Sequence, residues 1–226
     1  MTHQPIDKKI KIFFYLLIFF LFSTINNTSL IKNFNPRIQN INVKGIDDKL
    51  KPIIEKKFNY LLGKNIFFIN KTILIEKIKN INFIETFEIR KNYPHTIEIQ
   101  ILPAQLIAIT YLNNEKIFIG NNGKFIKENI SEESNLPRIF GNFLINDYLE
   151  LINLFKDSGL NYKNFKNFYY FPNKRWDVDI RENLVVKLPR KNVKESIDRI
   201  IIILKENEIN EINTIDLRIS NRVILN

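Results

Sequence analysis

The chain has 226 residues, 45% of them hydrophobic, and a formal net charge of +10 at pH 7. This composition supplies a folded core and excludes wholesale disorder, and the length allows one or two domains. The absence of cysteine excludes thiol catalysis, disulfides and cysteine-ligated metal sites, and two histidines are too few for a multi-histidine metal centre. The lysines are spread along the chain rather than clustered, so the charge predicts no nucleic-acid partner.

An uncharged stretch of twenty residues, 12–31, follows the lysines at positions 8, 9 and 11. A helix of this length rises ~30 Å, the thickness of one hydrocarbon core. We therefore predict a transmembrane helix over residues 12–31, preceded by a cytoplasmic tail over residues 1–11. The apolar part of this anchor is Ile12, Phe13, Phe14, Tyr15, Leu16, Leu17, Ile18, Phe19, Phe20, Leu21 and Phe22.

A cleaved signal peptide is the alternative, because it also has a basic start and a short apolar run. No Ala or Gly occurs before Gly45, and no pair of small residues with cleavage-site spacing closely follows the run. The sequence therefore favours a retained anchor. The three lysines before the run favour a cytoplasmic N-terminus. This preference is weak, because the basic residues Lys32 and Arg37 follow soon after the run.

Residues 36–104 predict a small α+β domain with the element order β-α-α-β-β. A strand over residues 37–43 ends at Gly45, and a helix over 50–62, capped by Asp47 or Asp48, ends at Gly63. Residues 65–69 read as a short buried link. Asn70 caps the second helix, which carries Ile73, Leu74, Ile78 and Ile81.

Two strands complete this domain, residues 83–90 and 95–101, joined by a turn at 91–94. In the second strand Ile97, Ile99 and Ile101 alternate with polar residues, as a half-buried strand requires. The expected architecture has both helices on one face of a three-stranded sheet. Pro103 marks the end of the domain.

Residues 105–226 predict a second, mixed β-domain with two helices. Short strands over 107–112, 116–119 and 124–126 are joined by turns at Asn113-Asn114 and Asn121-Asn122-Gly123. An amphipathic helix over 146–158 ends at Gly159, and Asn192 caps another that runs to Glu206. Between these helices a meander is expected, with strands over 165–171, 175–180 and 184–188.

The last dozen residues, 215–226, alternate like a single strand that forms a sheet edge. An edge strand has unpaired N–H and C=O groups that can template the strand of another protein. Asp216 and Arg218 predict either an intrastrand ion pair or a bond from Arg218 to a carboxylate of a partner. The expected partner-binding residues are Arg218, Ile219, Ser220, Asn221, Arg222, Val223, Ile224, Leu225 and Asn226.

No set of residues predicts catalysis, so we expect neither an enzyme nor a cofactor site. His95 stands beside Pro94 and reads as a strand-start residue rather than a general base. Glu85, Glu88 and Glu98 read as solvated side chains on neighbouring strands. Trp176 and the aromatic run 165–171 predict core packing, with a partner interface as the alternative.

At several points the chain resembles the FtsQ/DivIB family of bacterial cell-division proteins. Val43-Lys44-Gly45, Gly63-Lys64-Asn65-Ile66 and Tyr93-Pro94-His95-Thr96-Ile97-Glu98-Ile99 resemble the POTRA domain of the family, and Ala108 falls where the family has Ala. Leu136-Pro137-Arg138-Ile139-Phe140-Gly141, Arg175-Trp176-Asp177-Val178 and Val186-Lys187-Leu188-Pro189 resemble its β-domain, and Ile215-Asp216-Leu217-Arg218 with Arg222 resembles its terminal strand. The chain departs from the family in two places: Pro103 and Leu106, at the expected domain hinge, stand at the family's Glu and Pro positions, and Gly120-Asn121 replaces an acidic turn before Gly123.

The resemblance implies a non-enzymatic scaffold of the division machinery. It implies a single-pass protein of the inner membrane at the division septum, with a cytoplasmic N-terminus and periplasmic POTRA and β-domains. The implied partners are the FtsB/FtsL pair, bound by strand addition, and other division proteins bound through the POTRA-like domain. The alternatives are a POTRA-bearing component of transport or outer-membrane assembly, and an anchored periplasmic enzyme.

Overall fold

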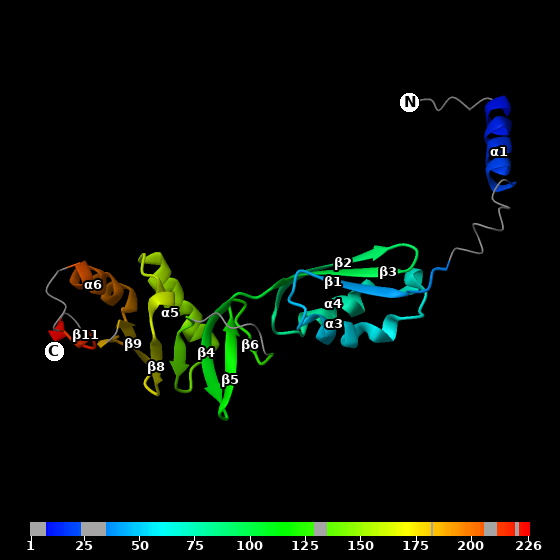
Figure 1. Ribbon diagram of the computed structural model, residues 1–226. Coiled ribbons are helices and arrows are strands. Elements are labelled where there is room, and N and C mark those ends of the chain that lie inside the picture. Colours follow the sequence, from blue (N-terminus) through cyan, green and yellow to red (C-terminus); the bar gives the residue numbers. More distant parts are fainter. Residues whose placement is uncertain (1–7, 24–34, 129–134, 182, 206–211, 220–221) are drawn as a thin grey trace.

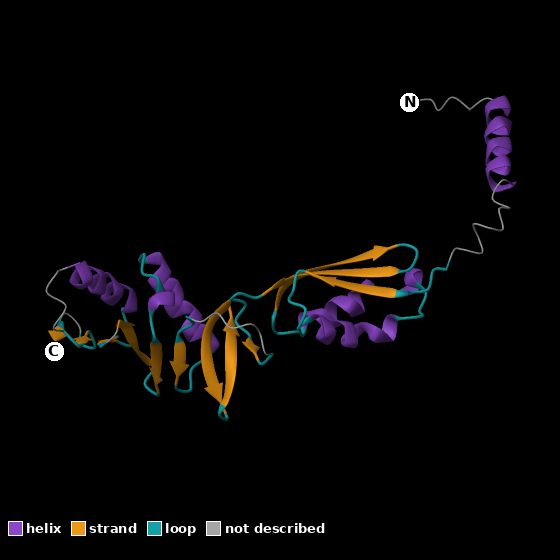
Figure 2. Ribbon diagram, viewed as in Figure 1, coloured by secondary structure: helices purple, strands orange, loops and turns teal. Residues whose placement is uncertain are grey.

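The computed structural model describes residues 8–23, 35–128, 135–181, 183–205, 212–219 and 222–226. It is a mixed α+β structure, as predicted, with a domain built on a small sheet followed by a domain built on a large sheet (Figures 1 and 2). Helix α1 (Lys8–Ser23) precedes both domains.

Helix α1 covers the first part of the predicted anchor. It has 16 residues, and its apolar side chains from Ile12 to Phe22 are exposed. Residues 24–31 of the predicted span lie outside the described residues. Within the described ranges, no helix has both the length and the apolar character that crossing a bilayer requires.

The small sheet has the strand order β1-β3-β2, and the predicted β-α-α-β-β order is confirmed. Strand β1 (Asn40–Lys44) pairs in parallel with β3 (Thr96–Pro103), and β2 (Ile84–Asn92) pairs antiparallel with β3. Helices α3 (Lys51–Phe58) and α4 (Lys71–Lys79) lie together on one side of this sheet (Figure 2). Ile97, Ile99 and Ile101 of β3 are buried, so the predicted alternation of this strand is confirmed.

The two predicted helix caps have different outcomes. The side chain of Asn70 accepts a hydrogen bond from Thr72 N–H at 2.9 Å, which confirms the cap of α4. The cap of α3 by an aspartate side chain is wrong, because the residue at the cap is Leu50, without a side-chain bond. The main-chain oxygen of Asp47 instead accepts from Leu50 N–H at 2.9 Å.

The buried link predicted at 65–69 is only partly buried. It forms a 3-10 turn, η2 (Ile66–Phe68), after the 3-10 turn η1 (Asn59–Leu61) that continues α3. Ile66 is fully buried, whereas Phe67 and Phe68 are 50% and 86% exposed. Successive side chains of a 3-10 turn point in three directions, so one side chain of the three faces the core. Of the apolar residues on the second helix, Leu74 and Ile78 are buried, whereas the side chain of Ile73 is 49% exposed.

The large sheet contains nine strands among the described residues, in the order β12-β11-β10-β9-β8-β7-β4-β5-β6. Its strands are β4 (Leu106–Leu112), β5 (Glu115–Gly120), β6 (Phe125–Ile126), β7 (Arg138–Phe140), β8 (Asn167–Phe171), β9 (Arg175–Arg181), β10 (Leu184–Lys187), β11 (Thr214–Asp216) and β12 (Ile224–Leu225). The turn η3 (Tyr162–Asn164) leads into β8. The expected meander β8-β9-β10 is confirmed by two antiparallel pairings.

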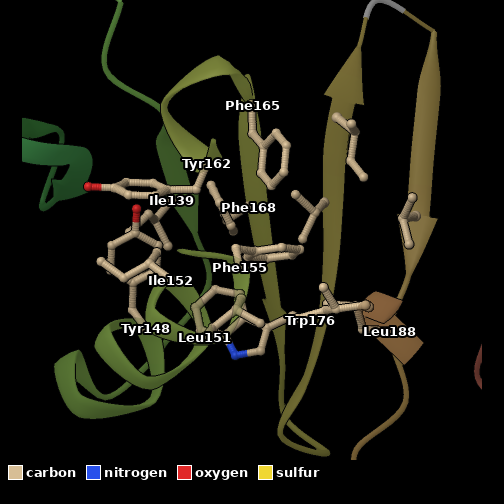
Figure 3. Packing of buried hydrophobic residues seen from close by; sticks show 14 of the residues in the cluster. Ile139, Tyr148, Leu151, Ile152, Phe155, Tyr162, Phe165, Phe168, Trp176 and Leu188 are labelled. Atoms are coloured by element: carbon tan, nitrogen blue, oxygen red, sulfur yellow. The ribbon is translucent and has the colours of Figure 1, made fainter. Parts of the chain in front are cut away.

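Helices α5 (Ile145–Asp157) and α6 (Val193–Lys205) lie on the same side of the large sheet (Figure 1). Between sheet and helices lies a core rich in aromatic rings (Figure 3). Phe168 of β8 is fully buried at the centre of this core. Its ring centroid lies 5.3–6.4 Å from those of four other rings, Tyr148, Phe155, Phe165 and Trp176.

Two glycines of the family-like motifs are required by the backbone. Gly45 and Gly141 have φ angles of +87° and +103°, which side chains with a Cβ rarely adopt. A Cβ at Gly45 would overlap the main-chain oxygen of Ile101, and one at Gly141 would overlap that of Tyr170. Both glycines therefore permit a turn of the chain to pass directly against a neighbouring strand.

The two domains share a core and a set of hydrogen bonds across Pro103. The core under the small sheet continues into β4, β5 and β6 through Leu106, Phe118 and Ile126. The side-chain amide of Asn122 donates to the oxygens of Asn82 and Ile84 at 3.0 and 3.1 Å. The hairpin of β5 and β6 is thus joined to the loop between α4 and β2 and to the first residue of β2.

We expect Phe168→Ala to lower the free energy of unfolding by about 3–5 kcal/mol, because it leaves a cavity among packed rings. The matched control is Ile202→Ala on α6, whose side chain is 61% exposed and should change stability by less than ~0.5 kcal/mol. Urea unfolding of both variants measures the difference. Equal effects would show that the ring cluster does not hold the domain together.

Candidate partner-binding edge

The C-terminal segment forms a hairpin at one edge of the large sheet. Strand β11 pairs in parallel with β10 and antiparallel with β12, which is the last strand in the order. The predicted edge is therefore present, but the prediction of one continuous strand over 215–226 is wrong. Strand β11 ends at Asp216, and β12 returns beside it.

The side chain of Asp216 explains why the strand stops. Its Oδ1 accepts a hydrogen bond from the main-chain N–H of Arg218 at 3.0 Å, which is a local turn that competes with the ladder. Arg222 N–H then donates to the oxygen of Ile219 at 3.2 Å as the chain turns back. Ser220 and Asn221, two of the predicted binding residues, lie outside the described residues.

The register of β12 determines which main-chain groups face outward. Asn226 and Thr214 exchange two hydrogen bonds, at 3.1 and 2.9 Å. Because hydrogen-bonded and non-bonded pairs alternate in an antiparallel ladder, the Ile224–Asp216 pair is bonded and the Leu225–Ile215 pair is not. The N–H and C=O of Leu225 therefore point away from β11, where no other described strand lies.

The hairpin also exposes apolar side chains beside these groups. Ile224 and Leu225 are 41% and 46% exposed, and Ile219 in the turn is 51% exposed. Ile224 shares a sheet face with Asp216, and Leu225 shares the other face with Ile215. A strand placed against β12 would thus meet apolar side chains on both faces.

Charged groups stand next to the hairpin. Nε of Arg218 donates to Oδ2 of Asp216 at 2.9 Å, so the predicted ion pair is formed within the chain. The hydrogen bonds from Arg218 hold the pKa of the Asp216 carboxyl below its usual range. On β9, burial raises the pKa of Asp177, which accepts a bond from Arg175 Nε at 3.2 Å.

The aromatic residues named from the sequence lie mainly in the core. Trp176 is 6% exposed and contacts the rings of Tyr148 and Tyr170, which confirms core packing (Figure 3). Phe165 and Phe168 are buried, and residues 169–171 are partly buried. These rings position the strands and leave the hairpin as the more open surface.

His95, Glu88 and Glu98, which were considered from the sequence, all make hydrogen bonds within the small domain. His95 lies directly before β3, and its main-chain oxygen accepts from Gln39 N–H at 2.9 Å, as expected for a strand-start residue. Glu88 bonds to Arg90, and Glu98 to Lys44, at 2.7 and 2.8 Å. These hydrogen bonds lower the pKa of both carboxyls. No cluster of metal-ligating side chains occurs in the described parts of the chain.

Two family models match the chain, and they divide it near Pro103. The FtsQ-type POTRA domain matches residues 36–102, and the C-terminal part of the cell division protein FtsQ/DivIB matches residues 108–218. The chain belongs to the FtsQ/DivIB family. The small sheet with its helices is thus the POTRA domain, and the large sheet with its helices is the β-rich C-terminal domain.

Relatives of known name agree with this assignment. The cell division protein FtsQ of Rickettsia bellii is 26% identical over 188 residues, which is 82% of this chain and 70% of that protein. FtsQ of Rickettsia felis is 25% identical over 190 residues, with the same shares. The cell division protein DivIB of Clostridium botulinum is 29% identical over 116 residues, 51% of this chain and 44% of that protein.

We expect Asp216→Asn to destabilise the C-terminal domain at pH 7 and to matter less in acid. A carboxyl whose pKa is lowered by folding stabilises the folded state above its unfolded pKa, near 4, and loses this contribution as the pH falls through the lowered value. The stability difference from wild type should therefore be largest from about pH 5 upward and shrink below about pH 4.

Urea unfolding between pH 2.5 and 7 measures this difference, with Glu115→Gln at the exposed start of β5 as the control. The asparagine oxygen still accepts from Arg218 N–H, so the turn itself is retained. A pH-independent loss would show that the carboxylate charge of Asp216 is not what stabilises the hairpin.

Proposed function

We propose that this protein is a non-enzymatic scaffold of the bacterial division machinery, as its family membership and its domain order support. In this proposal it spans the inner membrane once, with the POTRA and C-terminal domains in the periplasm at the division septum. Its C-terminal edge binds an FtsB/FtsL-like pair, and its POTRA domain binds other division proteins. The observation that carries the binding proposal is the outward-facing main chain of Leu225.

Strand addition at β12 would use the main-chain N–H and C=O of Leu225, which already point outward from the sheet edge. A partner strand gains main-chain hydrogen bonds from an existing ladder without having to order both strands. The exposed side chains of Ile224 and Leu225 would be covered on opposite faces of the extended sheet. Arg218, whose side chain is 42% exposed beside Asp216, is placed to bond a carboxylate of the partner.

The proposed anchor rests on the apolar surface of α1. Eleven successive side chains, from Ile12 to Phe22, are exposed and none is charged, so a hydrocarbon environment would bury them all. The uncharged sequence continues to Ile31, which completes the length of one bilayer core.

We expect Leu225→Pro to lower the affinity for the FtsB/FtsL-like pair at least about tenfold, because it removes the outward N–H and places a ring at the edge. Leu225→Ala is the matched control, since it truncates the side chain but keeps the N–H. Full-length variants are compared by binding to the immobilised pair and by thermal unfolding.

The proline variant should keep its unfolding temperature, because the lost N–H does not bond to β11. Equal affinities of the proline and alanine variants would reject strand addition at β12. Global unfolding of Leu225→Pro would instead show that the outward face of this strand is engaged within the protein. Deleting residues 219–226 should abolish binding without releasing the protein from membranes.

We expect the full-length protein to stay with membranes after carbonate washing and to keep its N-terminus. Replacing Leu16 and Phe19 by Lys should release it, since each charge at the centre of a span costs about 2.5–3.5 kcal/mol of insertion free energy. N-terminal sequencing of the membrane fraction completes the measurement. A mature N-terminus between Ser23 and Asn35 would show a cleaved signal peptide and reject the anchor.

A further inference from the structure

Three aromatic rings form an exposed cluster on the POTRA domain, which we call the aromatic tip: Phe67, Phe68 and Tyr93. Their exposed fractions are 50%, 86% and 55%. The rings of Phe67 and Tyr93 stack with their centroids 5.0 Å apart and their planes at 21°. Phe68 is the most exposed of the large apolar side chains described in the protein.

The tip is held in place by the main chain around it. Asn65 Oδ1 accepts from Phe67 N–H at 3.0 Å, and the main-chain oxygen of Asn65 accepts from Phe68 N–H at 3.2 Å. Nζ of Lys91, near Tyr93, donates to the oxygen of Ile69 at 2.9 Å and so joins the two segments that carry the rings. The rings are therefore exposed at a fixed site, which costs less entropy on docking than a mobile loop would.

The tip lies where the chain enters the domain from α1. Ile66 N–H donates to the oxygen of Pro36 at 2.8 Å, and Arg37 Nη1 donates to the oxygen of Gly63 at 3.1 Å. Figure 1 shows the β2–β3 turn and the entering chain at the same end of the small sheet. With the proposed span at residues 12–31, only residues 32–34 separate the membrane from Asn35, and so short a chain reaches at most about 15 Å.

The segment that carries Phe67 and Phe68 has charges of one sign in its sequence. Lys64 and Lys71 flank the two phenylalanines, and Lys91 stands two residues before Tyr93. No Asp or Glu occurs from Asn59 to Ile75. Aromatic rings accompanied by lysines suit the boundary between acyl chains and anionic headgroups, where the rings enter the apolar zone and the amines stay in water.

We propose that the aromatic tip docks on the surface of the membrane that holds α1, with its three rings in the interfacial zone and its lysines at anionic headgroups. This inference rests on the proposed membrane anchor. A lipid surface is favoured over a protein partner because the tether keeps the tip within reach of the membrane at all times. A high local concentration of this kind makes a weak contact effective.

The test uses single-cysteine spin labels, since the chain has no cysteine of its own. Full-length protein with Asn92→Cys, whose label sits beside Tyr93 and leaves all three rings intact, is reconstituted in vesicles of phosphatidylethanolamine and phosphatidylglycerol. Labels at Phe19→Cys in α1 and Ile202→Cys on the exposed face of α6 serve as membrane and water references. Collision with oxygen and with a water-soluble nickel complex reports the depth of each label.

We expect the label at residue 92 to be shielded from nickel, between the two references. Adding Phe67→Ser and Phe68→Ser should raise its nickel accessibility at least about twofold, because the apolar anchor is lost. Replacing Lys64 and Lys71 by Gln should raise it on anionic vesicles and leave it unchanged on vesicles without phosphatidylglycerol.

The outcomes separate this inference from the anchor on which it rests. A shielded label at 19 with a fully accessible label at 92 overturns tip docking and leaves the anchor standing. An accessible label at 19 rejects the anchor and tip docking together. Shielding at 92 that arises only when another division protein is added assigns the tip to a protein contact and overturns the lipid proposal.

Discussion

Burial of the aromatic rings of α5, β8 and β9 against one another is the contact on which the C-terminal domain depends. Phe168 and Trp176 lie on neighbouring strands and face the same helix, so their packing fixes both the strand pair and the helix above it. The outer strands have little core of their own. Strands β11 and β12 are three and two residues long; β11 is placed by pairing with β10, and β12 by pairing with β11. The aromatic core fixes β9, and successive pairing of β10, β11 and β12 then sets the position of the candidate binding edge.

The two edge strands of the large sheet, β6 and β12, differ in whether other parts of the protein cover them. At one end, β6 is covered, since Ile126 is fully buried in the POTRA core and Asn82 Nδ2 donates to the oxygen of Phe125 at 2.8 Å. At the other end, β12 carries exposed apolar side chains and outward main-chain groups. Edge strands that are neither covered nor charged are prone to pair with other chains. A protein that leaves one edge in this state while covering the other has the asymmetry expected of a directed binding site.

The sequence predicted the features that depend on local chemistry. The cap at Asn70, the alternation of Ile97, Ile99 and Ile101, and the glycine stop at Gly63 follow from a few neighbouring residues, and all are present. The hairpin of β11 and β12 was not predicted, because its cause is a single side chain, Asp216, that bonds to the main chain two residues later. The pattern Asp-x-Arg was read as one face of a strand, although it also suits a turn.

Exposure of apolar residues was the other feature that sequence reasoning missed. Phe67 and Phe68 stand in an unbroken apolar run, and such a run normally indicates burial. Their exposure results from the geometry of a 3-10 turn, which the run itself does not encode. Sequence reasoning also missed the bonds at the junction of the domains, where Gly120-Asn121 replaces the acidic turn of the family. Asn121 Oδ1 accepts from Gln105 N–H at 2.9 Å, so this departure makes bonds of its own at the hinge.

The hydrogen bonds at the junction hold together the two domains that carry the proposed docking surfaces. The aromatic tip and the β12 edge lie at opposite ends of the two-domain part of the molecule (Figure 1). Lys124 Nζ donates to the oxygen of Lys79 at 2.8 Å and, together with Asn122 and the shared core, ties the C-terminal domain to the POTRA domain. In the proposed arrangement, a tip held at the membrane would therefore restrict the height and direction of the edge as well. A partner strand rising from the same membrane would then meet an edge that is already oriented, and less rotational freedom would be lost on binding.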